Sequence, residues 1–235
     1  MAGKTKNKKA LQRNTSEVVQ VNSHTYGKHT RAARGSKTIA TINDVLTTHA
    51  EKTNTLNTAA KAVYDVLKLY SKGFREGQLW QAILSRMRKA KLVHFEALLH
   101  TLERLELNSR YALTRFGEPP VLSIKNNKRE LQIEMHQNTP PHLNKNDNCY
   151  QYELIAMLFN SEGVCVQHTM HETKWFNKKE AIHKEVYTIQ KPAIAKHYLL
   201  CLHLQSGING IATDTLATRG MAIVAVGLVA EERDK

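Results

Sequence analysis

Several residue types and patterns are scarce in this chain of 235 residues, and each shortage excludes a class of protein. No apolar run approaches the roughly 18 residues that a membrane-spanning helix requires, so we expect no membrane span. Aromatic residues make up only 6% of the chain and are not interleaved with the basic residues. The stacking platform typical of a protein that binds single-stranded nucleic acid is therefore missing.

Cysteine is also scarce, which bears on the cellular compartment. Cys149, Cys165 and Cys201 stand in apolar surroundings typical of strands, and this pattern predicts buried thiols. No apolar segment follows the N-terminal lysines, so a cleaved signal peptide is not indicated. A basic N-terminus poor in acids also suits an organellar transit peptide, although lysine outnumbers arginine there. We expect a cytoplasmic protein.

The motifs of the common enzyme classes are absent. The sequence contains no Gly-x-Ser-x-Gly, no Walker loop and no Gly-x-Gly-x-x-Gly after a strand. The glycines of GINGIAT, residues 207–213, stand three apart and predict a hairpin turn. We therefore expect a protein that is not an enzyme and binds no cofactor.

Twelve histidines raise the question of a metal site. In VCVQHTMHE, His168 and His171 stand three apart, so on a strand they point to opposite faces and do not converge. Cys201 and His203 share a face, and a zinc cluster of Cys165, Cys201 and His203 is the open alternative if their strands are neighbours. Core thiols and a polar outer histidine are the simpler interpretation, and we predict no metal ligands.

Positive charge is concentrated near the N-terminus. The chain carries a net charge of +13. Residues 1–38 hold nine Lys and Arg against one acid, whereas residues 121–235 hold thirteen against twelve. A basic arm of this kind can neutralise phosphates or dock on an acidic partner.

The arm has the composition of a segment that does not order itself, with two exceptions. EVVQV, residues 17–21, alternates well enough to add one strand to something else. In YGKHTRAARGSKT, glycines at positions 27 and 35 disfavour a helix, so we expect an extended or turn conformation. Its basic residues recur every three positions and are predicted contacts to a partner or to nucleic acid: Lys28, Arg31, Arg34 and Lys37.

Residues 39–117 have the period of helices. TLNTAAKAVYDVLKLYSKGF places apolar residues three and four apart, with a glycine stop at Gly73. Further helices are predicted over 78–91 and 93–107. Four cations near the end of the second helix could extend a phosphate-tracking surface, or form a solvated helix face: Arg86, Arg88, Lys89 and Lys91.

After residue 117 the period changes to two, which is typical of strands. The seven candidate strands are VLSIK, ELQIEM, YQYELIAMLF, VCVQHTM, HKEVYTI, HYLLCLHL and MAIVAVGLV. Short strands at this spacing predict an antiparallel sandwich, and their mixed polarity argues against a parallel sheet buried on both faces. The fold class is therefore α+β: a basic arm over 1–38, a small helical unit over 39–117 and an immunoglobulin-like β-sandwich over 118–235.

Four stretches, in three places along the chain, carry a resemblance to known proteins. They are the basic leader YGKHTRAARGSK, the helix KAVYDVLKLYSKGF, and the strands YELIAMLFNSEG and HYLLCLHLQSGINGIATDT. In their order along the chain they resemble short proteins of the Bacteroidota that share a domain of unknown function, although an Asp-Gly turn of that group is replaced here by residues 207–210. The resemblance implies a helical segment followed by an immunoglobulin-like sandwich, and it implies no site residues.

The function that we expect is a structural or adaptor protein that makes assembly contacts, with a protein partner or with itself, through its arm and helices. The alternative is a nucleic-acid-binding protein that uses the arm without regard to sequence. Charge suffices to touch phosphates, but no element that could read a base is visible in the sequence, so we favour a protein contact. Nothing in the sequence indicates a small-molecule ligand.

Overall fold

The computed structural model describes most of the chain in two units. The first unit is Met1–Thr53 and the second, which we call the body, is Asn54–Lys235. No helix among the described residues is long and apolar enough to cross a membrane. The described residues are 18–25, 27–32, 44–71, 76–108, 111–213 and 215–229.

The first unit contains an antiparallel hairpin. Strand β1 (Val18–Ser23) pairs with β2 (Gly27–Ala32). Gly27 has a φ of +67°, the left-handed conformation that glycine adopts without strain where a short loop returns to its strand. The strand predicted at EVVQV is therefore present, and its partner is the arm's own basic segment. The extended conformation predicted from Gly27 onward is confirmed as far as Ala32, and residues 33–43 lie outside the described part.

Three α-helices follow, and their predicted apolar faces are buried. The helices are α1 (Asp44–Tyr70), α2 (Glu76–Met87) and α3 (Phe95–His100). The described side chains of α1 up to residue 52 are polar or small and exposed. The buried positions of all three helices include Leu56, Ala60, Val63, Leu67, Leu79, Ile83, Met87 and Leu98.

The third helix is shorter than predicted. It ends at His100, and Arg104 has a φ of +61°. From Arg104 onward the backbone runs beside residues 221–223. The Arg104 amide donates to the carbonyl oxygen of Ile223 and the Leu107 amide to that of Met221, both at 2.8 Å. Leu102 and Leu105 are buried, but they lie beyond the end of the helix rather than on it.

All seven candidate strands are present, and all their pairings are antiparallel. Two short 3-10 helices are η1 (Leu113–Phe116) and η2 (Leu216–Thr218). The strands of the body are β3 (Val121–Asn126), β4 (Glu130–His136), β5 (Cys149–Phe159), β6 (Cys165–Glu172), β7 (Phe176–Asn177), β8 (Glu185–Gln190), β9 (His197–Ile208), β10 (Ile211–Ala212) and β11 (Arg219–Leu228). The turn predicted in GINGIAT joins β9 to β10, with Asn209 and Gly210 both at positive φ as in a type I′ hairpin.

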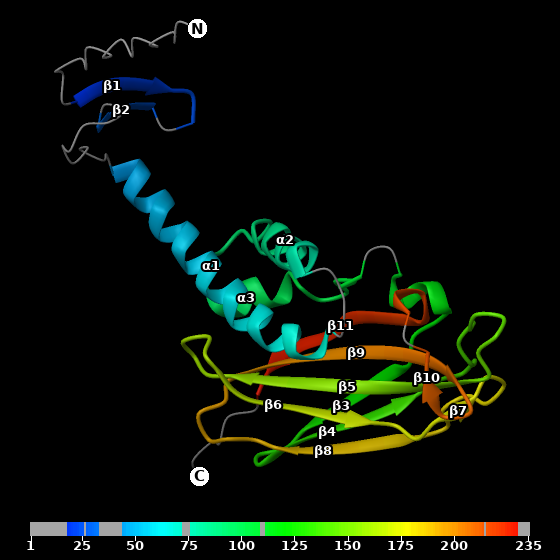
Figure 1. Ribbon diagram of the computed structural model, residues 1–235. Coiled ribbons are helices and arrows are strands. Elements are labelled where there is room, and N and C mark those ends of the chain that lie inside the picture. The colour runs from blue at the N-terminus through cyan, green and yellow to red at the C-terminus, as the bar shows by residue number, and fades with distance from the viewer. Residues whose placement is uncertain are drawn as a thin grey trace, which may run out of the picture. The chain divides into compact units, whose positions relative to one another are not determined.

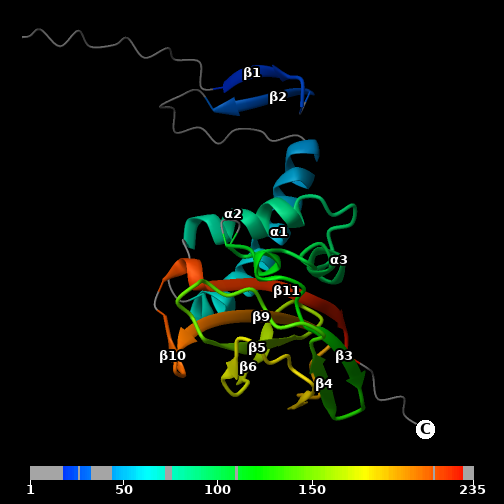
Figure 2. The same ribbon diagram turned by 90° about the vertical axis from the view of Figure 1, so that its right-hand side faces the viewer.

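The body has three layers (Figures 1 and 2). A six-stranded sheet has the order β10-β9-β5-β6, with β11 also paired to β9 and β7 to β5. A three-stranded sheet, β3-β4-β8, faces one side of it, and the helices cover the other side. The helical and the strand-rich segments therefore share a core, and the α+β class is confirmed.

The two central strands are buried on both faces. Every residue of β5 is buried, and β9 is buried over most of its length. Even-numbered side chains of β5, such as Leu154, pack toward the three-stranded sheet, whereas odd-numbered ones, such as Ile155, pack toward the helices. Mixed polarity in these strands therefore does not mark a solvent face: their polar residues lie inside.

Candidate functional site

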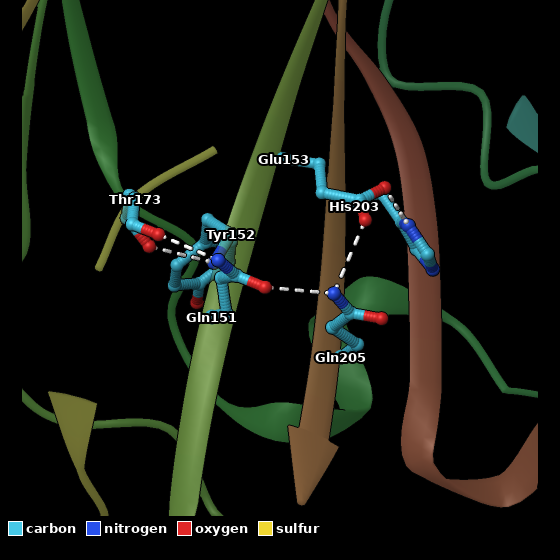
Figure 3. Close-up of polar contacts among 6 residues, drawn as sticks. All are labelled: Gln151, Tyr152, Glu153, Thr173, His203 and Gln205. Atoms are coloured by element: carbon cyan, nitrogen blue, oxygen red, sulfur yellow. Dashed lines mark hydrogen bonds and ion pairs between the residues drawn. The ribbon is translucent and has the colours of Figure 1, made fainter. Parts of the chain in front are cut away.

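A row of polar side chains lies on the helix-covered face of the six-stranded sheet, across its two central strands β5 and β9 (Figure 3). Gln151 lies opposite Gln205, and Glu153 lies opposite His203, because β5 and β9 pair in that register. The next pair on the same face, Ile155 and Cys201, belongs to the apolar core under the helices. The polar row is thus a direct continuation of the core.

The members of the row contact one another. The imidazole Nδ1 of His203 lies 2.8 Å from the Glu153 Oε2 atom. The amide of Gln205 donates to Glu153 Oε1 at 3.1 Å and to Gln151 Oε1 at 2.8 Å. Gln151 in turn donates to the carbonyl oxygen of Thr173 at 2.6 Å. Both oxygens of the buried carboxylate therefore accept a contact from β9 (Figure 3).

The contact between Glu153 and His203 is closed to solvent. A glutamate and a histidine in contact can exchange a proton, but both side chains here are 0% exposed. A substrate cannot reach them without opening the core. Because Glu153 meets His203 in only one register of β5 against β9, the contact favours that register over a shift that would bury either side chain without its partner.

Cys149 and Cys201 are buried as predicted, whereas Cys165 is only half-buried, and the three lie apart from one another. All three are free thiols. Cys165 is on β6 and lies opposite Phe159 of β5. Cys201 is on β9, which flanks the other edge of β5, and it lies opposite Ile155. Those two positions are four residues apart along β5, about 13 Å at the usual rise of a strand. The structure therefore does not bring Cys165 to Cys201 and His203, and no group of metal-binding side chains is found among the described residues.

Burial also fixes the ionisation of two thiols. It raises the pKa of Cys165 and raises the pKa of Cys201 well above its ordinary value. The thiolate, which is the nucleophilic form, is therefore disfavoured at both positions.

The two histidines of VCVQHTMHE point to opposite faces, as predicted. The Nδ1 atom of His168 lies 2.7 Å from the hydroxyl of Tyr70 on α1. The ring of His171 lies 5.3 Å from the ring of Tyr187 on β8, in the other sheet. His168 thus contacts a helix and His171 contacts the three-stranded sheet, so the two side chains do not converge on a metal site.

The predicted contact residues fall into two groups in separate units. Lys28 is exposed on β2, and Arg31 is in the same strand. Arg34 and Lys37 lie outside the described residues. In the body, one group gathers at the C-terminal end of α2, where cations complement the helix dipole; Arg86 is half-buried, and Arg88, Lys89 and Lys91 are exposed.

Two sets of residues escaped the sequence interpretation. The buried row was missed, although the polar residues at alternate positions of YQYELIAMLF and HYLLCLHLQ were a visible signal. The hairpin in the arm was half missed, because KHTRA was interpreted by its charge and not by its alternation. Comparison of the chain with models of known families, with curated proteins and with solved structures finds no match.

Proposed function

We propose that the chain is an adaptor without catalytic activity, which makes assembly contacts through its basic arm and its helices while the body serves as scaffold. One observation carries the proposal: among the described residues, β1 and β2 form a sheet of two strands, in a unit separate from the body. Two strands alone are marginally stable in water, so such a hairpin gains stability from a partner surface.

The chemistry of the body supports the same role. Its buried Glu153 and His203 are inaccessible, and burial keeps the thiols of Cys165 and Cys201 protonated. Three free cysteines also suit the reducing cytoplasm in which we place the protein.

We further infer that the two sheets of the body follow an immunoglobulin-like plan. The order β3-β4-β8 corresponds to strands A, B and E of that fold, and β6-β5-β9-β11 corresponds to C′, C, F and G. The helices then cover the outer face of the second sheet. An experimental structure in which β8 pairs elsewhere than with β4 would rule this plan out.

Light scattering coupled to size-exclusion chromatography tests the adaptor role. The full chain is compared with a variant that lacks residues 1–38, at equal concentrations and moderate salt. We expect the full chain to form a defined assembly, with itself or with a protein that co-purifies with it, and the shortened chain to be a folded monomer. A strict monomer in both cases, with no co-purifying partner, contradicts the proposal.

Nucleic-acid binding is the second candidate, and the concentration of charge favours it. Residues 1–38 carry nine basic residues and one acid, and the exposed Arg88, Lys89 and Lys91 form a second basic group. Binding of this kind weakens steeply with salt, with log affinity falling by about 0.9 per phosphate contact for each unit of log salt. Absence of any binding to duplex DNA at about 50 mM salt, where such contacts are strongest, would exclude it.

A further inference from the structure

The β1–β2 hairpin has one face that carries only polar groups among its described side chains. Gln20 pairs with Thr30 and Asn22 pairs with Lys28, so these four side chains share a face, which we call the polar face. Gln20, Asn22 and Lys28 are exposed, and Thr30 is half-buried. On the opposite face Val21 pairs with His29. The polar face thus presents two amides, an ammonium and a hydroxyl group side by side on a two-stranded ribbon.

These groups are the ones that distinguish bases in duplex DNA. Asparagine and glutamine bind the N6 and N7 atoms of adenine, lysine binds O6 and N7 of guanine, and threonine contacts the thymine methyl group. The major groove of B-DNA, about 12 Å wide, admits a two-stranded ribbon. The polar face measures about 5 Å between strands and about 7 Å along them, which suits two or three stacked base pairs.

Charge complementarity supports a nucleic acid as the occupant. The ribbon lies within residues 1–38, whose net charge of +8 follows from nine basic residues and one acid. Phosphates flank the major groove on both sides, so cations next to a ribbon in the groove meet them. The major groove of RNA is deep and narrow and does not admit the ribbon, which favours DNA.

We propose that the β1–β2 ribbon binds in the major groove of duplex DNA with Gln20, Asn22, Lys28 and Thr30 directed at base edges, so that DNA binding by the arm has a sequence preference. This inference rests on the second candidate function above. It replaces the expectation of binding without regard to sequence, because the ribbon supplies the reading element that no motif revealed.

The test uses the full chain and a random library of DNA duplexes selected at about 150 mM salt. Fluorescence anisotropy then compares the selected duplex with a shuffled duplex of equal composition over a range of salt concentrations. We expect the double change Gln20→Ala with Asn22→Ala to lower the preference for the selected duplex roughly fivefold to a hundredfold, as loss of a bidentate base contact does. The salt dependence stays unchanged, because both side chains are neutral.

Three further variants separate reading from charge and from folding. Gln20→Met with Asn22→Leu keeps side-chain volume but removes both amides, and it should lose the preference equally. His29→Ala, on the opposite face, should retain it. The triple change of Arg31, Arg34 and Lys37 to Ala should weaken both duplexes alike and make the salt slope shallower by up to about 2.7.

Each contrary outcome identifies what has failed. The chain could bind duplexes with a salt-dependent affinity but without a sequence preference, or the variants of Gln20 and Asn22 could keep that preference. Either result would show that the ribbon does not read bases, while nucleic-acid binding by the chain would stand. If the full chain binds no duplex at about 50 mM salt, both proposals fail. If the triple change instead abolishes a protein assembly and leaves DNA retention unaltered, the occupant of the arm is a protein and the inference is wrong.

Discussion

Glu153 is an ionisable side chain without exposed surface in the middle of the longest buried run among the described residues of the body. Its cost of burial is offset by contacts from two side chains of β9, His203 and Gln205. A buried pair of this kind contributes little net stability compared with well-packed apolar side chains, but it penalises every arrangement that separates its members. At the scale of the residue, we therefore interpret the row as a device that selects one strand register.

This interpretation predicts an asymmetry between single and paired substitutions. Glu153→Ala leaves the polar atoms of His203 and Gln205 buried without their carboxylate, and it should lower the free energy of unfolding by about 3 to 5 kcal/mol. Replacing Glu153 and His203 together by Leu should cost far less. Urea unfolding followed by circular dichroism measures both effects.

The matched control is Glu172→Ala, on the neighbouring strand. Glu172 lies directly opposite Glu153 but is exposed, so its loss should change stability by at most about 0.5 kcal/mol. Equal losses for Glu153→Ala and Glu172→Ala would show that the buried contacts have no such role.

Tyr187 gives a prediction about pH. It is 9% exposed, and burial, with a smaller contribution from Glu185, raises its pKa from 10.0 to about 12. The folded state therefore holds the phenolic proton more tightly than the unfolded chain, so this stability is complete below pH 10 and is lost as the pH rises toward 12. Tyr187→Phe should unfold less readily than the parent chain at high pH.

At neutral pH the same substitution should be nearly neutral, because the Tyr187 hydroxyl makes no hydrogen bond to the described part of the protein. Thermal melts of both chains at pH 8 and pH 11 provide the comparison. If Tyr187→Phe loses as much stability above pH 10 as the parent chain does, the loss is caused by other ionisable groups.

At the scale of the element, the turn between β5 and β6 holds the first residue of α3 in place. Gly163 has a φ of +81°, and a Cβ there would lie 2.5 Å from the ring of Phe95. That ring is itself confined, with its centroid 5.2 Å from Phe159 and 5.6 Å from His197. The turn, the helix and the central strands are therefore packed as one piece.

Two glycine substitutions test this packing. Gly210 has nearly the same φ, +80°, but its nearest neighbour, Trp175, is 3.9 Å away. Gly210→Ala should therefore lose only the left-handed backbone preference, about 1 to 2 kcal/mol. Gly163→Ala should lose about 1 to 3 kcal/mol more, because overpacking is added. Indistinguishable melting temperatures for the two variants would contradict the contact with Phe95.

Much of this level could be predicted from local pattern. Seven of the nine described strands of the body and the buried faces of α1 and α2 follow from periods of two and of 3.6. The contact of Glu153 with His203 could not be foreseen, because it depends on how two strands 50 residues apart pair. The early end of α3 likewise depends on β11, which accepts the backbone amides of Arg104 and Leu107. Contacts between distant segments decide both, and local periodicity carries no information about them.

The fold-level expectations met the same limit. The α+β class follows from the sequence. The division of the strands between two facing sheets does not. In the arm, the spacing of Lys28 and Arg31 was interpreted by charge, whereas the pairing of β1 with β2 makes strand alternation the deciding pattern. The polar face is therefore a property of the pair of strands and of neither alone.

At the scale of the whole molecule, the body is stable by its own packing, whereas we propose that the arm is stabilised by what it binds. The body holds one apolar cluster on each side of its central sheet. Among the described residues, the arm holds a sheet of two strands. Amide hydrogen exchange of the full chain tests this division most directly. In dilute protein that light scattering shows to be monomeric, amides of β5 and β9 should exchange only by global unfolding, and those of β1 and β2 should exchange orders of magnitude faster. Protection of β1 and β2 should rise only in an assembly or with bound DNA. Hairpin amides in the monomer that are as protected as those of β5 would contradict the account, because the arm would then be a stable part of the fold that needs no partner.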